Sequence, residues 1–218
     1  MLYDTVLLRT FAAICDAGSF TKAAREVNLT QSAVSLHVKR LEDQVGSRLI
    51  MRNTRGVRLT EQGRRVALQV LRHHRLIELF LAQELGMGWD RVHAEAEVLE
   101  HVLSEELEQL IAARLGNPTV DPHGDPIPTH EFEIEETQTR SLDELSTGAV
   151  GRFVRVSDSD PKMLRYLTGQ GVTLGDRLEV TGRQPFGGPV FVRLGEHELA
   201  LGGELARAMR IEVEVDAA

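Results

Sequence analysis

The stretch HHRLIELFLAQELGMGWDRVHAEAEVLEH, residues 73–101, gathers histidine and carboxylate side chains at helical spacing. The side chains three or four residues apart are His74 and Glu78, and then His93, Glu97, Glu100 and His101. Because such residues project from one face of a helix, each set can converge. Gly86 and Gly88 interrupt the helical pattern and Asp90 can cap a second helix, so the two segments can fold back on each other. The pattern predicts a divalent-metal site built from two helices.

A solvated, charged helix face is the ordinary alternative, since Glu and His are common on such faces. Six of the eight histidines nevertheless fall in the middle of the chain: His73, His74, His93, His101, His123 and His130. Apolar residues beside them, such as Leu76 and Val92, place part of the stripe at the edge of a packed surface. An unpaired charge is costly there, and a bound cation would remove that cost.

This region resembles the metal-binding and dimerisation domain of the diphtheria-toxin-repressor (DtxR/MntR) family. The motifs that carry the resemblance are Arg72-His73-His74-Arg75-Leu76, Val92-His93-Ala94-Glu95-Ala96, Leu99-Glu100-His101-Val102-Leu103-Ser104-Glu105, Asn117-Pro118-Thr119 and Pro122-His123-Gly124-Asp125-Pro126-Ile127-Pro128.

The resemblance implies two metal ions per subunit, a fold with a dimer interface, and two sets of ligands. The primary site would use Glu97, Glu100 and His101, and the ancillary site would use His74, Glu78 and His93. The iron-sensing branch has a cysteine at the position of Glu97, whereas the manganese-sensing branch has a carboxylate, as here. A hard oxygen ligand favours Mn(II), with Fe(II) next.

Composition is that of a globular protein, with 42% hydrophobic and 27% charged residues in 218. No apolar run is long enough to span a bilayer, and the N-terminus lacks the features of a signal peptide. We therefore expect a cytoplasmic protein with no membrane partner and no organic cofactor. The single cysteine, Cys15, excludes an internal disulfide and a cysteine zinc site.

The net charge of −8 hides a strong asymmetry along the chain. Residues 1–75 contain 13 Lys and Arg against 6 Asp and Glu, a net charge of +7, which leaves −15 for the remainder. A basic module on an acidic body is expected when one end of a protein meets phosphates.

That basic third predicts a winged helix-turn-helix. Ser19 and Thr30 can cap two successive helices, and the second helix, residues 31–42, turns Val34, Val38 and Leu41 inward. The wing would be residues 50–59. The polar and basic side chains left for phosphates and base edges are Thr30, Gln31, Ser32, Ser35, His37, Lys39 and Arg40 on the helix, with Arg52 and Arg55 on the wing.

The basic third resembles the DNA-binding domain of LysR-type regulators. The matching motifs are Gly18-Ser19-Phe20-Thr21-Lys22-Ala23-Ala24, Leu29-Thr30-Gln31-Ser32-Ala33-Val34-Ser35, Lys39-Arg40-Leu41-Glu42 and Arg55-Gly56-Val57-Arg58-Leu59-Thr60-Glu61-Gln62-Gly63. Leu36 and His37 depart from the pattern, so a base preference cannot be transferred. The chain is thus a mosaic joined near residues 60–71.

The mosaic affects the coupling between metal binding and the DNA-binding domain. The metal-repressor family takes primary-site ligands from its first helix, and the similar stretch of this chain places Val6 and Arg9 at those positions. Neither side chain binds a cation. Asp4 is the nearest carboxylate that could substitute.

The C-terminal part changes to short alternating strands separated by glycine turns, which is typical of a small barrel. It resembles the SH3-like, FeoA-like domain that ends many members of the metal-repressor family. That resemblance implies a further ancillary ligand from this domain. Asp160 occupies the matching place, with Met163 as a possible second ligand, Asp158 as a competing choice and a helix cap as the structural alternative for Asp160.

Together these observations predict a mainly α protein with a C-terminal all-β domain. The expected parts are a winged helix-turn-helix at residues 1–66, a helical metal-binding and dimerisation domain at 67–128, a linker at 129–145 and an SH3-like domain at 146–218. We expect a homodimeric, Mn(II)-dependent regulator of operator DNA that represses metal-uptake genes and is not an enzyme. The alternatives are a LysR-like regulator with metal-independent DNA binding and a dinuclear metal hydrolase.

Overall fold

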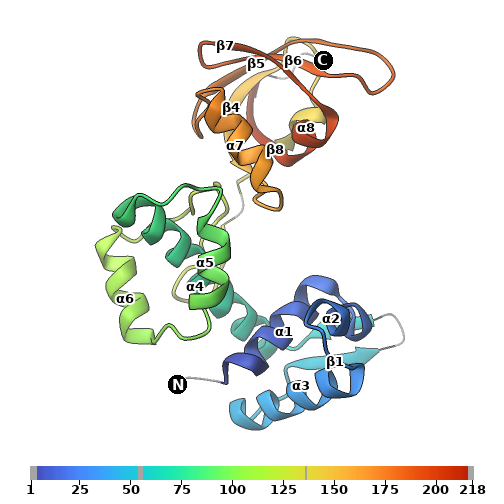
Figure 1. Cartoon of the computed structure of the whole chain (residues 1–218), viewed down its shortest axis with the longest axis vertical. Helices are drawn as coiled ribbons and strands as arrows, with labels where there is room; N and C mark the ends of the chain where they lie inside the picture. The colour runs from blue at the N-terminus through green and yellow to red at the C-terminus, as the bar shows by residue number, and fades with distance from the viewer. Residues whose placement is uncertain (1–3, 54–55, 136, 216–218) are drawn as a thin grey trace. The chain divides into compact units, whose positions relative to one another are not determined.

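The computed structural model describes residues 4–53, 56–135 and 137–215. Its helices are α1 (Thr5–Ala17), α2 (Phe20–Glu26), α3 (Gln31–Val45), α4 (Glu61–Leu85), α5 (Val92–Leu99), α6 (Glu105–Arg114), α7 (Pro161–Gly169) and α8 (Gly203–Ala208), with a 3-10 turn η1 (Leu142–Glu144) (Figure 1). Its strands are β1 (Ile50–Asn53), β2 (Gly56–Leu59), β3 (Arg140–Ser141), β4 (Val150–Val156), β5 (Arg177–Arg183), β6 (Val190–Leu194), β7 (His197–Leu201) and β8 (Met209–Val215). The predicted fold class, mainly helical with a C-terminal β domain, is confirmed.

The chain forms two compact units. Unit 1 contains the described residues up to Leu81 together with Ala94–Thr119 and Ile127–Ile134. Unit 2 contains Ala82–His93, Val120–Pro126 and the described residues from Glu135 onward. The units thus divide the predicted metal-binding domain, because two of its loops pack with the barrel.

The N-terminal part of unit 1 is the predicted winged helix-turn-helix. Side chains of Ser19 and Thr30 cap α2 and α3 by accepting from backbone N–H groups three residues on. The inward faces of α1, α2 and α3 meet in one core around Phe11 and Ile14, both fully buried. Strands β1 and β2 pair antiparallel, with Ile50 opposite Leu59, to make the wing.

The helical remainder of unit 1 is organised on α4. Leu76 and Leu79 of α4 pack with Ile111 and Ala112 of α6 and with Ile127. This contact holds α6 against α4. Among the described residues, no helix is long and apolar enough to cross a membrane.

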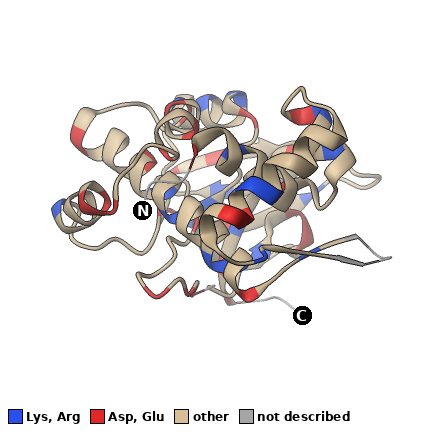
Figure 2. Ribbon diagram, turned by 90° about the horizontal axis from the view of Figure 1, so that it is seen from below, with Lys and Arg blue, Asp and Glu red and all other residues tan. Residues whose placement is uncertain are grey.

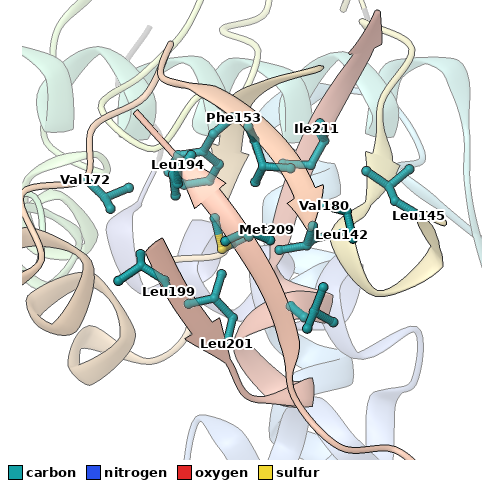
Figure 3. Packing of buried hydrophobic residues seen from close by; sticks show 14 of the residues in the cluster. Leu142, Leu145, Phe153, Val172, Val180, Leu194, Leu199, Leu201, Met209 and Ile211 are labelled. Carbon is teal, nitrogen blue, oxygen red and sulfur yellow. The ribbon is translucent and has the colours of Figure 1, made fainter. Parts of the chain in front are cut away.

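Unit 2 is built on a six-stranded antiparallel sheet in the order β3-β8-β4-β5-β6-β7. Register shifts within β4 and β5 accompany its curvature. Phe153, Leu194, Met209 and Ile211 point into the enclosed core (Figure 3). Packing of this kind on one face explains the alternating pattern of the strands.

The barrel begins earlier than the predicted boundary at residue 146. Leu142 and Leu145 lie within the stretch predicted to be a linker, yet they are 0% and 1% exposed in the barrel core. Arg140 and Ser141 pair with β8. Two isolated leucines among acidic residues show neither the period of a strand nor that of a helix, so the sequence pattern did not predict their burial.

Candidate metal centre

Helix α4 places His74 and Glu78 on one face, as their spacing predicts. The His74 Nε2 atom lies 3.0 Å from Glu78 Oε1. The Glu78 side chain is only 1% exposed, although it is a carboxylate. A buried carboxylate needs a positive partner, and His74 provides one.

Glu100 and His101 follow directly after α5 and are both buried. Val92 and Ala96, fully buried on α5, fix this helix, and the Glu100 N–H donates to Ala96 O at 2.9 Å. The two Glu100 oxygens face different imidazoles. Glu100 Oε2 lies 2.5 Å from His74 Nδ1, whereas Glu100 Oε1 lies 3.2 Å from His101 Nε2.

These contacts join four side chains into one chain of groups, Glu78–His74–Glu100–His101, which we call the imidazole–carboxylate cluster. The sequence assigned its members to two separate metal sites. The structure connects those assignments through Glu100, which contacts a histidine of each set. Glu97 of the same predicted set is exposed on α5.

A proton on His74 offsets part of the negative charge of the cluster. Burial alone lowers the pKa of His74, but hydrogen bonds and charge interactions with Glu100 and Glu78 outweigh it and raise the pKa to about 9. The pKa of His101 is lowered, chiefly by burial, with the negative charge of Glu100 opposing the shift. His74 thus holds a positive charge between two carboxylates, and neutral His101 has a lone pair suitable for a metal.

This donor set fits a divalent cation. Two imidazoles and two carboxylates are the ligand types that Mn(II) and Fe(II) accept, and the cluster already accommodates one positive charge at its centre. A cation would replace that proton, so metal binding and protonation of His74 compete.

Contacts between α4 and α6 support the cluster. Arg72 donates through Nε to Glu108 Oε1 and through Nη1 to the Pro128 carbonyl, both at 2.6 Å. His73 Nδ1 lies 3.2 Å from the Glu100 carbonyl, and its Nε2 lies 3.3 Å from Glu108 Oε2. Although burial raises the pKa of Glu108, hydrogen bonds from His73 and Arg72 lower it overall.

Arg72, His73 and Glu108 support the cluster although the sequence pattern does not predict this role for them. His73 belongs to the histidine-rich middle of the chain. Because it contacts the backbone of Glu100, it helps to orient a candidate ligand. The available signal was the pair Arg72 and His73 beside the apolar positions of α4.

Unit 2 contains a separate pair of candidate ligands. His93 Nδ1 lies 2.8 Å from Asp158 Oδ2, with the side chains 43% and 27% exposed. Asp160 instead caps α7, since its Oδ1 accepts from the Lys162 N–H at 2.8 Å. Of the two aspartates that the sequence left in competition, Asp158 is therefore the one beside His93. The assignment of His93 to one site with His74 and Glu78 stays a prediction.

The residues predicted to meet DNA lie mostly on the outer face of α3. Gln31, Ser32, Lys39 and Arg40 are exposed, Ser35 is half-buried, and Thr30 caps the helix. The positions of Lys and Arg are coloured blue on the ribbon in Figure 2. Arg52 has its backbone in β1, and Arg55 lies outside the described residues.

His37 differs from the rest of this set. Its Nδ1 lies 2.9 Å from the hydroxyl of Thr10 on α1, a residue only 2% exposed. The Thr10 hydroxyl donates its proton to the Val6 carbonyl, so His37 Nδ1–H is the donor in the contact with Thr10. The ring therefore packs against α1, a placement that depends on a residue 27 positions away.

Comparison with known proteins agrees with this arrangement. Residues 60–129 match the family described as iron dependent repressor, metal binding and dimerisation domain. Residues 6–64 match the bacterial regulatory helix-turn-helix proteins of the lysR family, and residues 140–214 match the FeoA domain. The iron-dependent repressor IdeR of Mycobacterium leprae is 32% identical over 228 residues, covering 97% of this chain and 98% of that protein.

The chain belongs to the iron-dependent repressor family. IdeR of Mycobacterium tuberculosis is also 32% identical, over 88% of this chain and 87% of that protein. A solved structure described as a manganese-dependent transcriptional repressor in complex with manganese has a TM-score of 0.82 and 36% identity. That likeness covers 95% of this chain and 99% of the other.

In this repressor α1 presents an apolar side chain toward the cluster. Leu8 lines a cavity of about 300 Å³ together with Glu100 and His101. Val6 is 57% exposed, and Asp4 caps α1 by accepting from the Val6 and Leu7 N–H groups. Arg9 acts on His101 only as a positive charge that lowers its pKa further.

Proposed function

We propose that this chain is a transcriptional repressor that binds operator DNA as a homodimer when loaded with Mn(II), with Fe(II) as the second choice. The contact of Glu100 with both His74 and His101 is the observation that carries this proposal. A carboxylate placed between two imidazoles can bridge two cations. The relatives cited above are described as repressors and not as enzymes, which favours a repressor over a dinuclear hydrolase.

Two metal ions per subunit are supported by the number of donors available. His74 and Glu78 lie at one end of the cluster, and His101 lies at the other. Glu97, exposed on α5, can supply a ligand to the second metal ion beside His101. The oxygen-rich set, which contains no thiolate, favours Mn(II) over softer cations.

We propose that His93 and Asp158 of unit 2 bind the ancillary metal ion. Their 2.8 Å contact already pairs an imidazole with a carboxylate, and their partial exposure leaves room for a cation. Asp160 was the first choice by position in the sequence. Its carboxylate has one oxygen engaged in the cap of α7, which supports Asp158 as the ligand.

Dimerisation is proposed through the apolar surface of α5, α6 and the residues between them. The large hydrophobic side chains exposed there are Val98, Leu99, Val102, Leu107 and Leu110. Contiguous exposed apolar residues mark interaction surfaces. Two paired subunits would present two α3 helices to successive major grooves about one helical turn apart. A protein with this function acts in the cytoplasm.

The decisive experiment compares operator binding by the purified protein with Mn(II) and with a chelator, followed by fluorescence anisotropy. We expect tight binding only with Mn(II). Equal affinity in both conditions would favour the alternative of a metal-independent, LysR-like regulator, because α1 presents Leu8 rather than a ligand toward the cluster. Light scattering of the same samples tests the dimer, and a monomer at micromolar concentration with Mn(II) would contradict it.

A further inference from the structure

Glu42 is an acidic residue on the helix that we propose to meet DNA. Its Oε1 accepts two backbone hydrogen bonds, from Leu49 N–H at 2.8 Å and from Ile50 N–H at 3.2 Å. Ile50 begins β1, the first strand of the wing. The side chain of Glu42 therefore ties α3 to the start of the wing.

Thr60, the residue directly before α4, and Gly63 in the first turn of α4 hold the same segment from the other side. Thr60 donates through its N–H to the Leu49 carbonyl at 2.9 Å and through its hydroxyl to the Arg48 carbonyl at 2.6 Å. A Cβ on Gly63 would lie 2.0 Å from Leu49 O, so only glycine permits this approach. Residues 48–50, which we call the wing base, are thus held between α3 and α4.

The wing depends on this attachment because it is small. Each of its strands has four residues, and an isolated two-stranded hairpin is at best marginally stable in water. Contacts at the wing base consequently decide where the hairpin lies relative to α3. Hydrogen bonds from N–H groups to a carboxylate are among the stronger ones available for this purpose.

The position of Glu42 is unfavourable for DNA binding on charge alone. It lines a groove of about 770 Å³ whose other members include Ser35, Lys39 and Arg48. A carboxylate beside phosphates repels them. Its engagement with two N–H donors explains why an acidic side chain is useful at this place.

We propose that Glu42 is a positioning residue for operator binding, which fixes the wing at the orientation in which the wing and α3 contact DNA together. This rests on the proposed DNA-binding function. Helix α4, which begins directly after Thr60, also carries His74 and Glu78. The start of α4 therefore contacts the wing base, and the same helix carries half of the metal cluster.

The test compares Glu42→Ala with Asp43→Ala, which removes the same charge from an exposed neighbour. Loss of a negative charge alone should leave operator affinity unchanged or raise it, as we expect for Asp43→Ala. Glu42→Ala should instead weaken binding about tenfold, the cost of losing hydrogen bonds to a charged group. The salt dependence should become shallower by about one unit for each phosphate contact that the wing loses.

Two further variants separate positioning from general destabilisation. Glu42→Gln retains an oxygen acceptor and should restore most of the affinity, whereas Glu42→Asp, one methylene shorter, should not. Arg58→Ala removes an exposed arginine of β2, and it should cost less in the Glu42→Ala background than in the wild type. Mn(II) binding, measured on each variant, shows that unit 1 remains folded.

Operator affinity of Glu42→Ala equal to that of the wild type, or strictly additive effects with Arg58→Ala, would overturn the proposal. If Glu42→Ala does not fold, the Gln and Asp variants decide it, because equal affinity of those two would also overturn it. Failure of the wild type to bind DNA with Mn(II) would instead refute the proposed function. The two failures are therefore distinguishable.

Discussion

The imidazole–carboxylate cluster of unit 1 and the His93–Asp158 pair of unit 2 combine the same groups in opposite surroundings. In the cluster the side chains of Glu78 and Glu100 are 1% and 10% exposed, whereas His93 and Asp158 are 43% and 27% exposed. An unpaired charge is costly in the buried cluster, whereas solvent screens the charges of the exposed pair. The buried cluster should therefore dominate both metal affinity and stability.

The largest expected effect is on metal affinity. Glu100→Ala removes the carboxylate that contacts both His74 and His101 and should weaken Mn(II) binding by at least about 100-fold, since even indirect supports of a metal site cost 10–100-fold. Titration calorimetry measures it. Glu95→Ala, which removes an exposed carboxylate of the preceding helix α5, is the matched control and should bind normally. Similar affinities for the two variants would place the metal elsewhere.

The second prediction concerns pH in the presence of a chelator. The pKa of His74 is raised to about 9, above its usual 6.5, so its protonated form stabilises the folded state. This stabilisation is fully present below pH 6.5 and is lost as the pH rises through about 9. Its upper limit is about 3 kcal/mol, and urea unfolding at several pH values measures it. His74→Gln should flatten that dependence.

The pH dependence of Mn(II) affinity gives a second test of the proton on His74. Because the cation replaces the proton on His74, Mn(II) affinity should increase as the pH rises from 6.5 toward 9. An affinity independent of pH over this range would show that metal binding does not displace the proton of His74.

The smallest effect is expected in unit 2, where two neighbouring aspartates should behave differently. Asp158→Ala should weaken binding of a second Mn(II) by about tenfold, with little change in stability. Asp160→Ala should lower the free energy of unfolding by about 1 kcal/mol through loss of the α7 cap, with Mn(II) affinity unchanged. Calorimetry and thermal unfolding of both variants distinguish them, and the reverse pattern would restore Asp160 as the ligand.

Local patterns were sufficient for much of the fold. The caps at Ser19 and Thr30, the inward face of α3 and the strands of the barrel follow from periodicity and turn chemistry within short windows. The pairing of His74 with Glu78 is of the same kind, since one helical turn separates them. The burial of Leu142 and Leu145 in the barrel core was not predicted, because neither residue belongs to a periodic segment.

Relations between distant residues required the tertiary structure. The sequence by itself determined that His74, Glu78, Glu100 and His101 stand at ligand spacing, because helical geometry depends only on neighbours. Packing decided that Glu100 joins two histidines, that Asp158 rather than Asp160 meets His93, and that His37 turns toward Thr10. Each of these depends on contacts between segments far apart in the chain, and many arrangements of those segments are compatible with the same local pattern.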